Sequence, residues 1–310
     1  MKVGIIGAGA VGSACLLSLV TGQVAREIVL VNRTRARAEG MVADLQYGAT
    51  LGTTVDLTAG DYADLKGADV VLITAGVNEK DGGATDRDDT DGRLRLLEEN
   101  AKVYRDIVPQ IVAAAPDAVL LVVTDPPDPL AELALNLAGH DKVVSSGTFL
   151  DTQRLKFHVA RYLGVHASAV EGLVLGEHGT SQVFVWSSVR IAGIPLMDVL
   201  GYGEEQCEKF QKEIEEEVRH ANITIIEGTG ASQLGIGVVA ARLTRAILYD
   251  ERLVLPVGSH VPEYGTTLSV PSIVGRQGIV RRLTPHLSES EKQLLAESAR
   301  KIAQSMKDAC

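Results

Sequence analysis

A glycine-rich turn near the start of the chain most constrains its fold. The apolar run Val3–Ile6 leads directly into Gly7-Ala8-Gly9-Ala10-Val11-Gly12, and residues 11–20 then show the apolar spacing of a helix. Between a buried strand and a helix, a Gly-x-Gly-x-x-Gly turn lets the backbone approach a pyrophosphate. The helix N-terminus adds free N–H groups and the positive end of its dipole. The sequence therefore predicts a dinucleotide site contacted by Gly7, Gly9, Ala10, Val11 and Gly12.

The rest of the first half repeats this alternation of strand and helix. Short apolar, β-branched runs occupy residues 3–6, 28–31, 70–74, 119–123 and 143–146. Helical patterns separate them, most clearly at 11–20 and 94–115. Runs of this kind are typical of parallel strands covered on both faces. We therefore predict an α/β protein with a Rossmann-type, doubly wound parallel sheet.

The second half is less regular and predicts an α+β domain. Its helical patterns cover residues 151–163, 204–226 and 231–249, and short strands are expected at 254–256 and 269–274. A capping box, Ser288 to Glu291, starts a last helix. We expect a dinucleotide-binding domain at 1–147, including a mobile loop at 77–93, and a catalytic and substrate domain at 148–310.

Composition excludes several functional classes. The net charge of −10, without a long basic run, argues against nucleic-acid binding. No stretch is long and apolar enough to span a bilayer, and Met1-Lys2 runs into the first strand without a signal peptide. Cys15, Cys207 and Cys310 lack the spacing of a metal site or a disulfide framework. These features predict a cytoplasmic protein without a bound metal or a membrane partner.

The end of the second strand bears on cofactor choice. NAD-specific sites usually carry Asp or Glu there to hold the ribose 2′-hydroxyl, but this chain has Asn32 followed by Arg33. Asn32 does not repel a 2′-phosphate, and Arg33 can pair with one. We therefore favour NADP(H) over NAD(H). Two alternatives stay open: Asn32 holds the ribose while the arginines are only a solvated helix start, or the site accepts both cofactors.

Two further motifs supply groups for proton transfer and anion binding. Leu150-Asp151-Thr152-Gln153-Arg154 places a carboxylate and a guanidinium three residues apart, on one face of a helix. Gly176-Glu177-His178-Gly179 follows downstream. Histidine exists in both protonation states near neutral pH, so it suits a general acid and base. With the glycine turn, these motifs in this order resemble the L-lactate/malate dehydrogenase family over residues 3–305.

That resemblance implies a role for each matching position. His178 gives a proton to the substrate oxygen or takes one from it, Asp151 orients the imidazole, and Arg154 binds the substrate carboxylate. Arg93 swings in with the mobile loop and polarises the reacting carbonyl, while Ser232 lies beside the substrate side chain. The cofactor, by the same resemblance NAD(P), also lies against Thr74, Ala75, Gly76, Val123 and Asp125.

One strand-end motif departs from the family. Where the family has Thr-Asn-Pro, this chain has Thr124-Asp125-Pro126. An amide can donate a hydrogen bond to a substrate carbonyl oxygen, whereas an ionised carboxylate only accepts. Asp125 is therefore protonated, or points away, or faces a substrate that presents a donor such as an imine N–H. The last case implies an imine reductase or amino-acid dehydrogenase on the same frame.

The loop before Arg93 is longer than in the family. Its insert, Asp81–Gly92, is acidic and glycine-rich. Glu79 occupies the position where the family has Gln for lactate and Arg for malate, and a carboxylate there argues against a dicarboxylate substrate. Arg87 restores malate binding if the insert folds inward; alternatively, Glu79 faces solvent and the insert has no role.

Together these features predict an oxidoreductase that interconverts a 2-oxo acid and an L-2-hydroxy acid by hydride transfer, lactate-dehydrogenase-like with an altered substrate pocket. The alternatives are a malate dehydrogenase, the imine chemistry above, and a non-catalytic cofactor-binding relative. By resemblance, the expected partners are the small-molecule substrate and further copies of the chain, in a homodimer or homotetramer.

Overall fold

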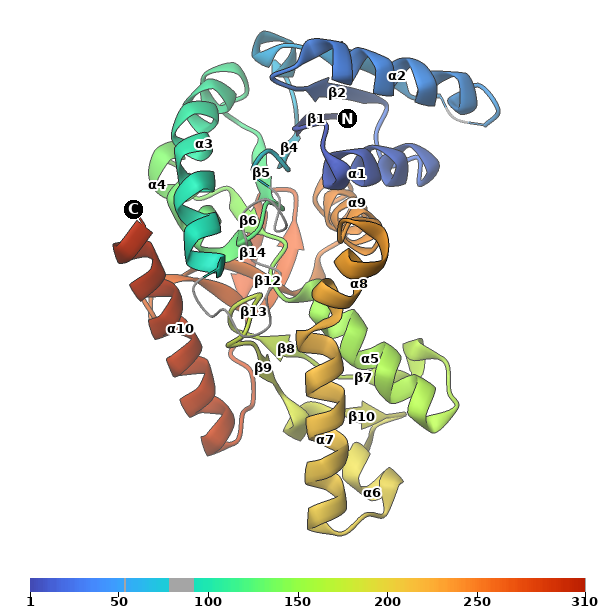
Figure 1. The fold of residues 1–310 in the computed structure, drawn as a ribbon, viewed down its shortest axis with the longest axis vertical. Helices are drawn as coiled ribbons and strands as arrows, with labels where there is room; N and C mark the ends of the chain where they lie inside the picture. The colour runs from blue at the N-terminus through green and yellow to red at the C-terminus, as the bar shows by residue number, and fades with distance from the viewer. Residues whose placement is uncertain (53, 78–91, 310) are drawn as a thin grey trace.

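Six parallel strands form the centre of the molecule, in the order β3-β2-β1-β4-β5-β6 (Figure 1). The computed structural model describes residues 1–52, 54–77 and 92–309, with the side chains of 92–94 left out. The strands are β1 (Lys2–Ile6), β2 (Glu27–Val31), β3 (Asp56–Gly60), β4 (Val70–Ile73), β5 (Val119–Val122) and β6 (Val143–Ser145). The predicted Rossmann-type sheet is confirmed. The strand β3 was not predicted because its alternating exposed and buried residues, DLTAG, form a polar edge rather than an apolar run.

Helices cover both faces of this sheet. The first-half helices are α1 (Ala10–Thr21), α2 (Arg35–Ala49), α3 (Gly92–Ala114) and α4 (Pro127–Ala138). Side chains on one face, such as Ile5, Leu30 and Leu72, pack in one core with α1 and α2. Those on the other, such as Val29 and Ile73, pack in a second core with α3 and α4. This alternation explains why the strand sequences are apolar throughout.

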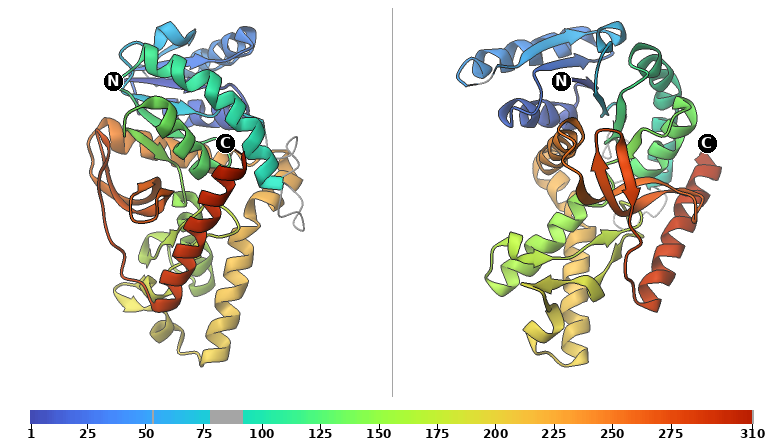
Figure 2. Two further views of the ribbon diagram at one scale, coloured as in Figure 1. Left: turned by 90° about the vertical axis from the view of Figure 1, so that its left-hand side faces the viewer. Right: turned by 180° about the vertical axis from the view of Figure 1, so that it is seen from behind.

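Three antiparallel strands from the second half extend the same sheet. They are β12 (Leu253–Val261), β13 (Thr266–Gly275) and β14 (Gly278–Arg282). The β12 strand joins the edge of β6, where Gly258 pairs with Ser145, so the sheet has nine strands. Figure 2 shows these orange-red strands between the blue-to-green half and the yellow-green elements. The predicted strands at 254–256 and 269–274 were too short, and β14 was missed.

The remaining elements pack around this extension. The helices are α5 (Phe149–Leu163), α6 (Leu196–Leu200), α7 (Glu204–Arg219), α8 (Ala221–Thr229), α9 (Leu234–Leu248) and α10 (Glu289–Ala309). Short strands complete the list: β7 (Val170–Glu171), β8 (Val174–Leu175), β9 (Val183–Phe184), β10 (Arg190–Ile191) and β11 (Ile194–Pro195). The α9 helix packs against α1, where a Cβ on Gly237 would lie 2.6 Å from the Ala14 carbonyl carbon. The second half is therefore held to both the sheet and the first helix.

The prediction of one helix over 204–226 was wrong. The chain leaves helical geometry at His220 (φ −100°, ψ 6°), which separates α7 from α8. The two helices bury their apolar residues in different places. Phe210, Ile214 and Val218 of α7 join a core with α5, whereas Ile226 of α8 lines a cavity beside the sheet. The α9 helix also begins later than the predicted 231–249, at Leu234.

Among the described helices, none alone combines the length and apolarity needed to cross a membrane. Only α8 and α9 together meet that test, by length and composition, as a pair bent by 119°. Most side chains along α9 are buried within the protein.

Candidate active site

The predicted glycine turn has the geometry that close backbone packing requires. Gly7 has a φ of +110°, and a Cβ there would lie 2.8 Å from the Ala75 nitrogen. A Cβ on Gly12 would lie 2.0 Å from the Gly7 carbonyl oxygen. Gly9 differs, because a Cβ there would meet nothing within 4 Å. The first and third glycines are needed by the fold, whereas the space over Gly9 at the start of α1 is open to a phosphate group.

A cavity of about 450 Å³ opens beside this turn; we call it the glycine-loop cavity. It lies between the carboxyl ends of β4 and β5, the start of α5, and α8 and α9. Ten predicted site residues line it: Gly9, Ala10, Val11, Thr74, Gly76, Val123, Asp125, Arg154, His178 and Ser232. Residues far apart in sequence therefore meet at the edge of the sheet where ligands of doubly wound folds bind.

Asp151 links the two functional motifs. Its Oδ2 lies 2.6 Å from His178 Nδ1, and its Oδ1 accepts a hydrogen bond from Arg154 Nη1 at 3.1 Å. The carboxylate is buried, with its side chain 2% exposed. One buried acid thus fixes the imidazole and the guanidinium together. With Nδ1 facing Asp151, Nε2 lies on the other side of the ring, toward Asp125.

Asp125 lines the same cavity and does not point away from it. Its Oδ1 lies 4.0 Å from His178 Nε2. The peptide bond between Asp125 and Pro126 is cis. Of the three interpretations of this residue, the structure removes the one in which the carboxylate faces elsewhere.

Asn32 uses both ends of its side chain within the protein. Its Oδ1 accepts from the Ala8 N–H at 2.9 Å, and its Nδ2 donates to the Thr34 carbonyl at 3.0 Å. It therefore connects the end of β2 to the glycine turn. Arg33 is exposed, and Arg37 lines the glycine-loop cavity. Arg35, by contrast, is paired with Glu39 and Asp61.

Comparison with known proteins gives the family. Residues 1–146 match the model of the lactate/malate dehydrogenase NAD binding domain, and residues 148–310 match that of the lactate/malate dehydrogenase alpha/beta C-terminal domain. The chain belongs to the lactate/malate dehydrogenase family. It is a nicotinamide-dependent 2-hydroxy-acid dehydrogenase, and the resemblance predicted from its motifs is confirmed.

Individual relatives agree along nearly the whole length. The chain is 43% identical over 300 residues to an L-lactate dehydrogenase of Deinococcus radiodurans, covering 96% of each chain. It is 42% identical over 306 residues to an L-lactate dehydrogenase of Thermus aquaticus, again covering 96% of each. A solved lactate dehydrogenase from a Medee basin deep-sea metagenome library superposes with a TM-score of 0.91 at 31% identity, covering 99% of this chain and 98% of that one.

Two buried polar residues of this dehydrogenase were not assigned roles from sequence. Asn100 of α3 accepts from the Val77 N–H at 2.6 Å and donates to the Asp125 carbonyl at 2.8 Å. Asp128, in the first turn of α4, accepts from the His178 N–H at 2.7 Å. Asn100 follows the predicted Arg93 on α3, and Asp128 follows the Thr124-Asp125-Pro126 motif. Neither was predicted, because hydrogen bonds to backbone atoms leave no sequence motif.

Part of the predicted site lies outside the described residues. Glu79, Arg87 and nearly all of the predicted loop 77–93 fall there. Arg93 is in the first turn of α3, and its side chain is not described. Within the described part of the chain, no cluster of three or more His, Cys, Asp or Glu residues could hold a metal ion.

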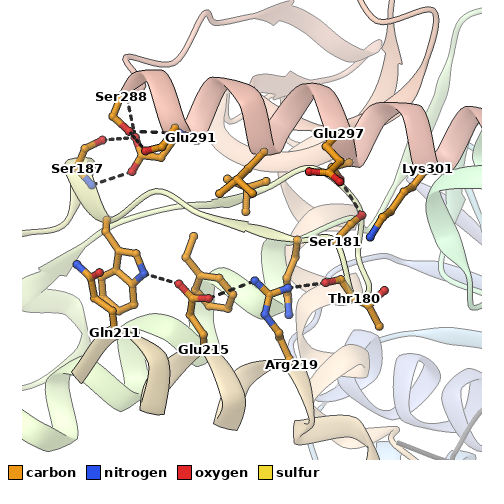
Figure 3. A pocket seen from close by; sticks show the side chains of 17 residues that line it. Thr180, Ser181, Ser187, Gln211, Glu215, Arg219, Ser288, Glu291, Glu297 and Lys301 are labelled. Atoms are coloured by element: carbon orange, nitrogen blue, oxygen red, sulfur yellow. Dashed lines mark hydrogen bonds and ion pairs between the residues drawn. The ribbon is translucent and has the colours of Figure 1, made fainter. Parts of the chain in front are cut away.

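A second cavity of about 500 Å³ lies between α7, α10 and residues 180–187; we call it the α7/α10 cavity (Figure 3). Glu215 accepts from Trp186 Nε1 at 2.8 Å and from Arg219 Nη2 at 3.3 Å. Arg219 also donates to the Thr180 carbonyl at 2.6 Å, with its guanidinium carbon 5.0 Å from the centre of the Phe184 ring.

Glu291 of α10 is held in the same way at the other end of the α7/α10 cavity. Its carboxylate accepts from the Ser187 N–H at 3.0 Å, the Ser187 hydroxyl at 2.6 Å and the Ser288 N–H at 2.7 Å. The last of these completes the predicted capping box. Burial acts to raise the pKa of Glu291, but the hydrogen bonds from Ser187 and Ser288 outweigh it and leave this pKa below its usual value.

Proposed function

We propose that this dehydrogenase interconverts a small monocarboxylic 2-oxo acid, with pyruvate as the first substrate to test, and the corresponding L-2-hydroxy acid. The observation that carries the proposal is Asp151, which holds His178 and Arg154 together in the glycine-loop cavity. The L-lactate dehydrogenase names of the relatives support the choice of substrate. The domain boundary near residue 147 and the residue roles below are parts of the same proposal.

In the proposed reaction, Arg154 binds the substrate carboxylate. Arginine has five N–H donors, and within the described residues only Nη1 has a protein partner. The other donors are available for a planar, bidentate contact with the substrate.

His178 moves the proton. The hydrogen bond from Nδ1–H to Asp151 stabilises the imidazolium, so that Nε2 can donate to the substrate oxygen during reduction and accept during oxidation. A bound nicotinamide supplies the hydride or accepts it. The open space over Gly9, the start of α1 and the neighbouring cavity fit the phosphates and ring of such a cofactor. Ser232, which also lines the cavity, is proposed to contact the substrate side chain.

Arg93 is proposed to complete the site by polarising the substrate carbonyl. Glu79 is proposed to disfavour oxaloacetate and malate, because two carboxylates would meet there. Malate dehydrogenase activity is the alternative within the same reaction class. A panel containing both pyruvate and oxaloacetate separates them.

Asp125 favours a second candidate reaction. A carboxylate 4.0 Å from His178 Nε2 stands where a ketone oxygen would be repelled and where an imine N–H would find an acceptor. Replacement by Asn removes the charge and supplies an N–H donor in place of a carboxylate that only accepts. We expect Asp125→Asn to raise kcat/KM for pyruvate about tenfold, the value of one hydrogen bond to a polarised oxygen.

For the cofactor, we favour NADP(H) over NAD(H). The absence of a carboxylate at Asn32, the exposed Arg33 and the cavity-lining Arg37 support this preference. Because the Asn32 side chain is already bonded to Ala8 and Thr34, it has little capacity left to discriminate, and dual specificity is the alternative. The ratio of kcat/KM for NADPH and NADH distinguishes the two.

We also propose that the chain is a cytoplasmic homodimer or homotetramer. Large apolar side chains are exposed along neighbouring helices: Leu17 on α1, Tyr47 on α2, and Leu234 and Val238 on α9. The proposal is that these side chains are covered by a second copy of the chain, since interaction surfaces expose apolar residues. Light scattering on the purified protein measures the mass directly.

The deciding experiment follows NADPH and NADH oxidation with pyruvate, oxaloacetate and longer or cationic 2-oxo acids, each with and without ammonia or methylamine. Turnover of pyruvate without amine supports the proposal. Turnover only with amine replaces it with imine reduction. No turnover of any substrate, with cofactor binding retained, leaves a non-catalytic relative.

A further inference from the structure

A buried carboxylate on α4 holds the backbone of His178. Asp128 has no exposed surface, and its Oδ2 accepts from the His178 N–H at 2.7 Å. Its Oδ1 accepts from the Ser145 hydroxyl at 2.7 Å, and this hydroxyl accepts in turn from the Gly147 N–H at 3.0 Å. A Cβ on Gly258 would lie only 2.4 Å from Oδ1, so the carboxylate fits tightly between α4, β6 and β12. Asp128 thus connects the parallel sheet to the segment that carries the proposed proton donor.

We propose that Asp128 is a positioning residue of the dehydrogenase, fixing the main chain of His178 while Asp151 fixes its ring. This inference rests on the proposed role of His178 in proton transfer. The two hydrogen bonds, at 2.7 Å to the main chain and 2.6 Å to Nδ1, hold the residue from opposite ends. With both ends held, Nε2 keeps one direction into the cavity, and reacting groups must be held to within a fraction of an ångström.

The charge of Asp128 is costly to the fold. Burial raises its pKa from 3.8 to about 6, although the hydrogen bonds from His178 and Ser145 act to lower it. Between about pH 4 and pH 6 the folded protein therefore binds more protons than the unfolded chain. Stability falls as the pH rises through this window, and the full penalty is present above it. A neutral isostere should escape the penalty.

Several charged groups face His178, and Asp128 adds to them. Asp151 and Asp125 lie beside the ring, Asp128 lies at its main chain, Glu177 is its neighbour, and Arg154 is bound to Asp151. Each carboxylate favours the imidazolium, and Arg154 opposes it. Removing the charge of Asp128 should therefore lower the pKa of His178.

The test is Asp128→Asn. The amide oxygen can still accept from the His178 N–H, while the NH₂ group faces the Ser145 hydroxyl, which can accept. A neutral amide oxygen is a weaker acceptor than a carboxylate, so the His178 main chain is held less firmly. We therefore expect kcat to fall about tenfold with KM within about twofold, because proton transfer is impaired while binding by Arg154 is untouched. The pH at which reduction is half lost should move down by roughly half a unit. Thermal stability at pH 8 should equal or exceed that of the wild type.

Glu132→Gln is the matched control, since it makes the same chemical change on the same helix. Glu132 accepts from His260 Nδ1 at 3.0 Å and from the Thr267 hydroxyl at 2.6 Å, away from His178. It should leave kcat and the pH profile unchanged. The proposal fails if Asp128→Asn keeps the wild-type kcat and the wild-type pH dependence of reduction. It also fails if the only change is a loss of stability.

A measurement without substrate separates this inference from the proposed function. The ring of His178, labelled and assigned with His178→Asn, is titrated by NMR in the wild type and in Asp128→Asn. A lowered His178 pKa supports the inference even if no 2-oxo acid is turned over, and an unchanged pKa in an active enzyme defeats it alone. Should Asp128→Asn not fold, Ser145→Ala loosens the carboxylate and keeps its charge. The Ser145→Ala variant should then have a kcat a few-fold below that of the wild type, and full activity would count against the proposal.

Discussion

Two cavities of similar size, one lined by His178 and the other by the segment 180–187, are built in opposite ways. The glycine-loop cavity is about 450 Å³ and the α7/α10 cavity about 500 Å³, so volume does not tell them apart. In the α7/α10 cavity, Glu215, Arg219 and Glu291 bond to neighbouring protein groups. In the glycine-loop cavity, one buried acid, Asp151, holds both His178 and Arg154, and both of these residues line the cavity.

The difference shows what distinguishes a reactive site from a structural one. Internal pairing stabilises the α7/α10 cavity and leaves little to offer a ligand. The glycine-loop cavity is instead lined by ionisable groups of both signs, Asp125, His178 and Arg154, and burial of Asp128, which holds the His178 main chain, costs stability. Substitutions in the glycine-loop cavity should therefore change rates, and those in the α7/α10 cavity should change stability.

The largest effect is expected from His178→Asn. Removing a positioned acid and base should lower kcat/KM about 10²- to 10⁴-fold in both directions. Cofactor binding, followed by quenching of protein fluorescence or by calorimetry, should stay within about twofold, because the glycine turn is untouched. A variant that keeps more than a tenth of the wild-type rate would show that another group transfers the proton.

A smaller loss is expected from Arg154→Lys. Lysine keeps the positive charge but lacks the planar fork, so one of two hydrogen bonds to the substrate carboxylate is lost. We expect KM for the 2-oxo acid to rise about tenfold or more, with a smaller change in kcat. The comparison is Arg219→Lys in the α7/α10 cavity, where kcat and KM should not change. Equal kinetic effects from the two substitutions would remove the distinction between the cavities.

The glycine-loop cavity was more predictable from sequence than the α7/α10 cavity. Gly7, Gly9 and Gly12 form a contiguous motif whose backbone chemistry follows from the residue type. The Asp151–Arg154 pair lies within one helical turn, so its proximity follows from spacing. The apolar strands likewise fixed the parallel sheet. Patterns of this kind involve residues close together in the chain, so the sequence alone is enough to recognise them.

What was missed depends on contacts between distant residues. Asp128 meets His178 across 50 positions, and Asn100 meets Asp125 across 25. The edge strand β3 and the break at His220 depend on the elements packed against them. Their own sequences are also compatible with a loop at 56–60 and with one continuous helix over 204–226. The α7/α10 cavity joins residues such as Ser187 and Glu291, 104 positions apart, and only half of it, the capping box, has a local signature.

The smallest effect is expected from Glu291→Gln in the α7/α10 cavity, where stability rather than rate should change. Its carboxylate accepts three hydrogen bonds, and the loss of the charge should lower the free energy of unfolding by about 1 kcal/mol. Because the pKa of Glu291 is lowered in the folded protein, its stabilisation is complete above the unfolded value near 4.5 and is lost as the pH falls through the folded pKa. Denaturant unfolding at pH 7 and below pH 4.5 should show the gap between wild type and variant closing in acid. The kcat of the variant should stay within about twofold; a larger fall, at unchanged stability, would place the α7/α10 cavity among the parts that control the reaction.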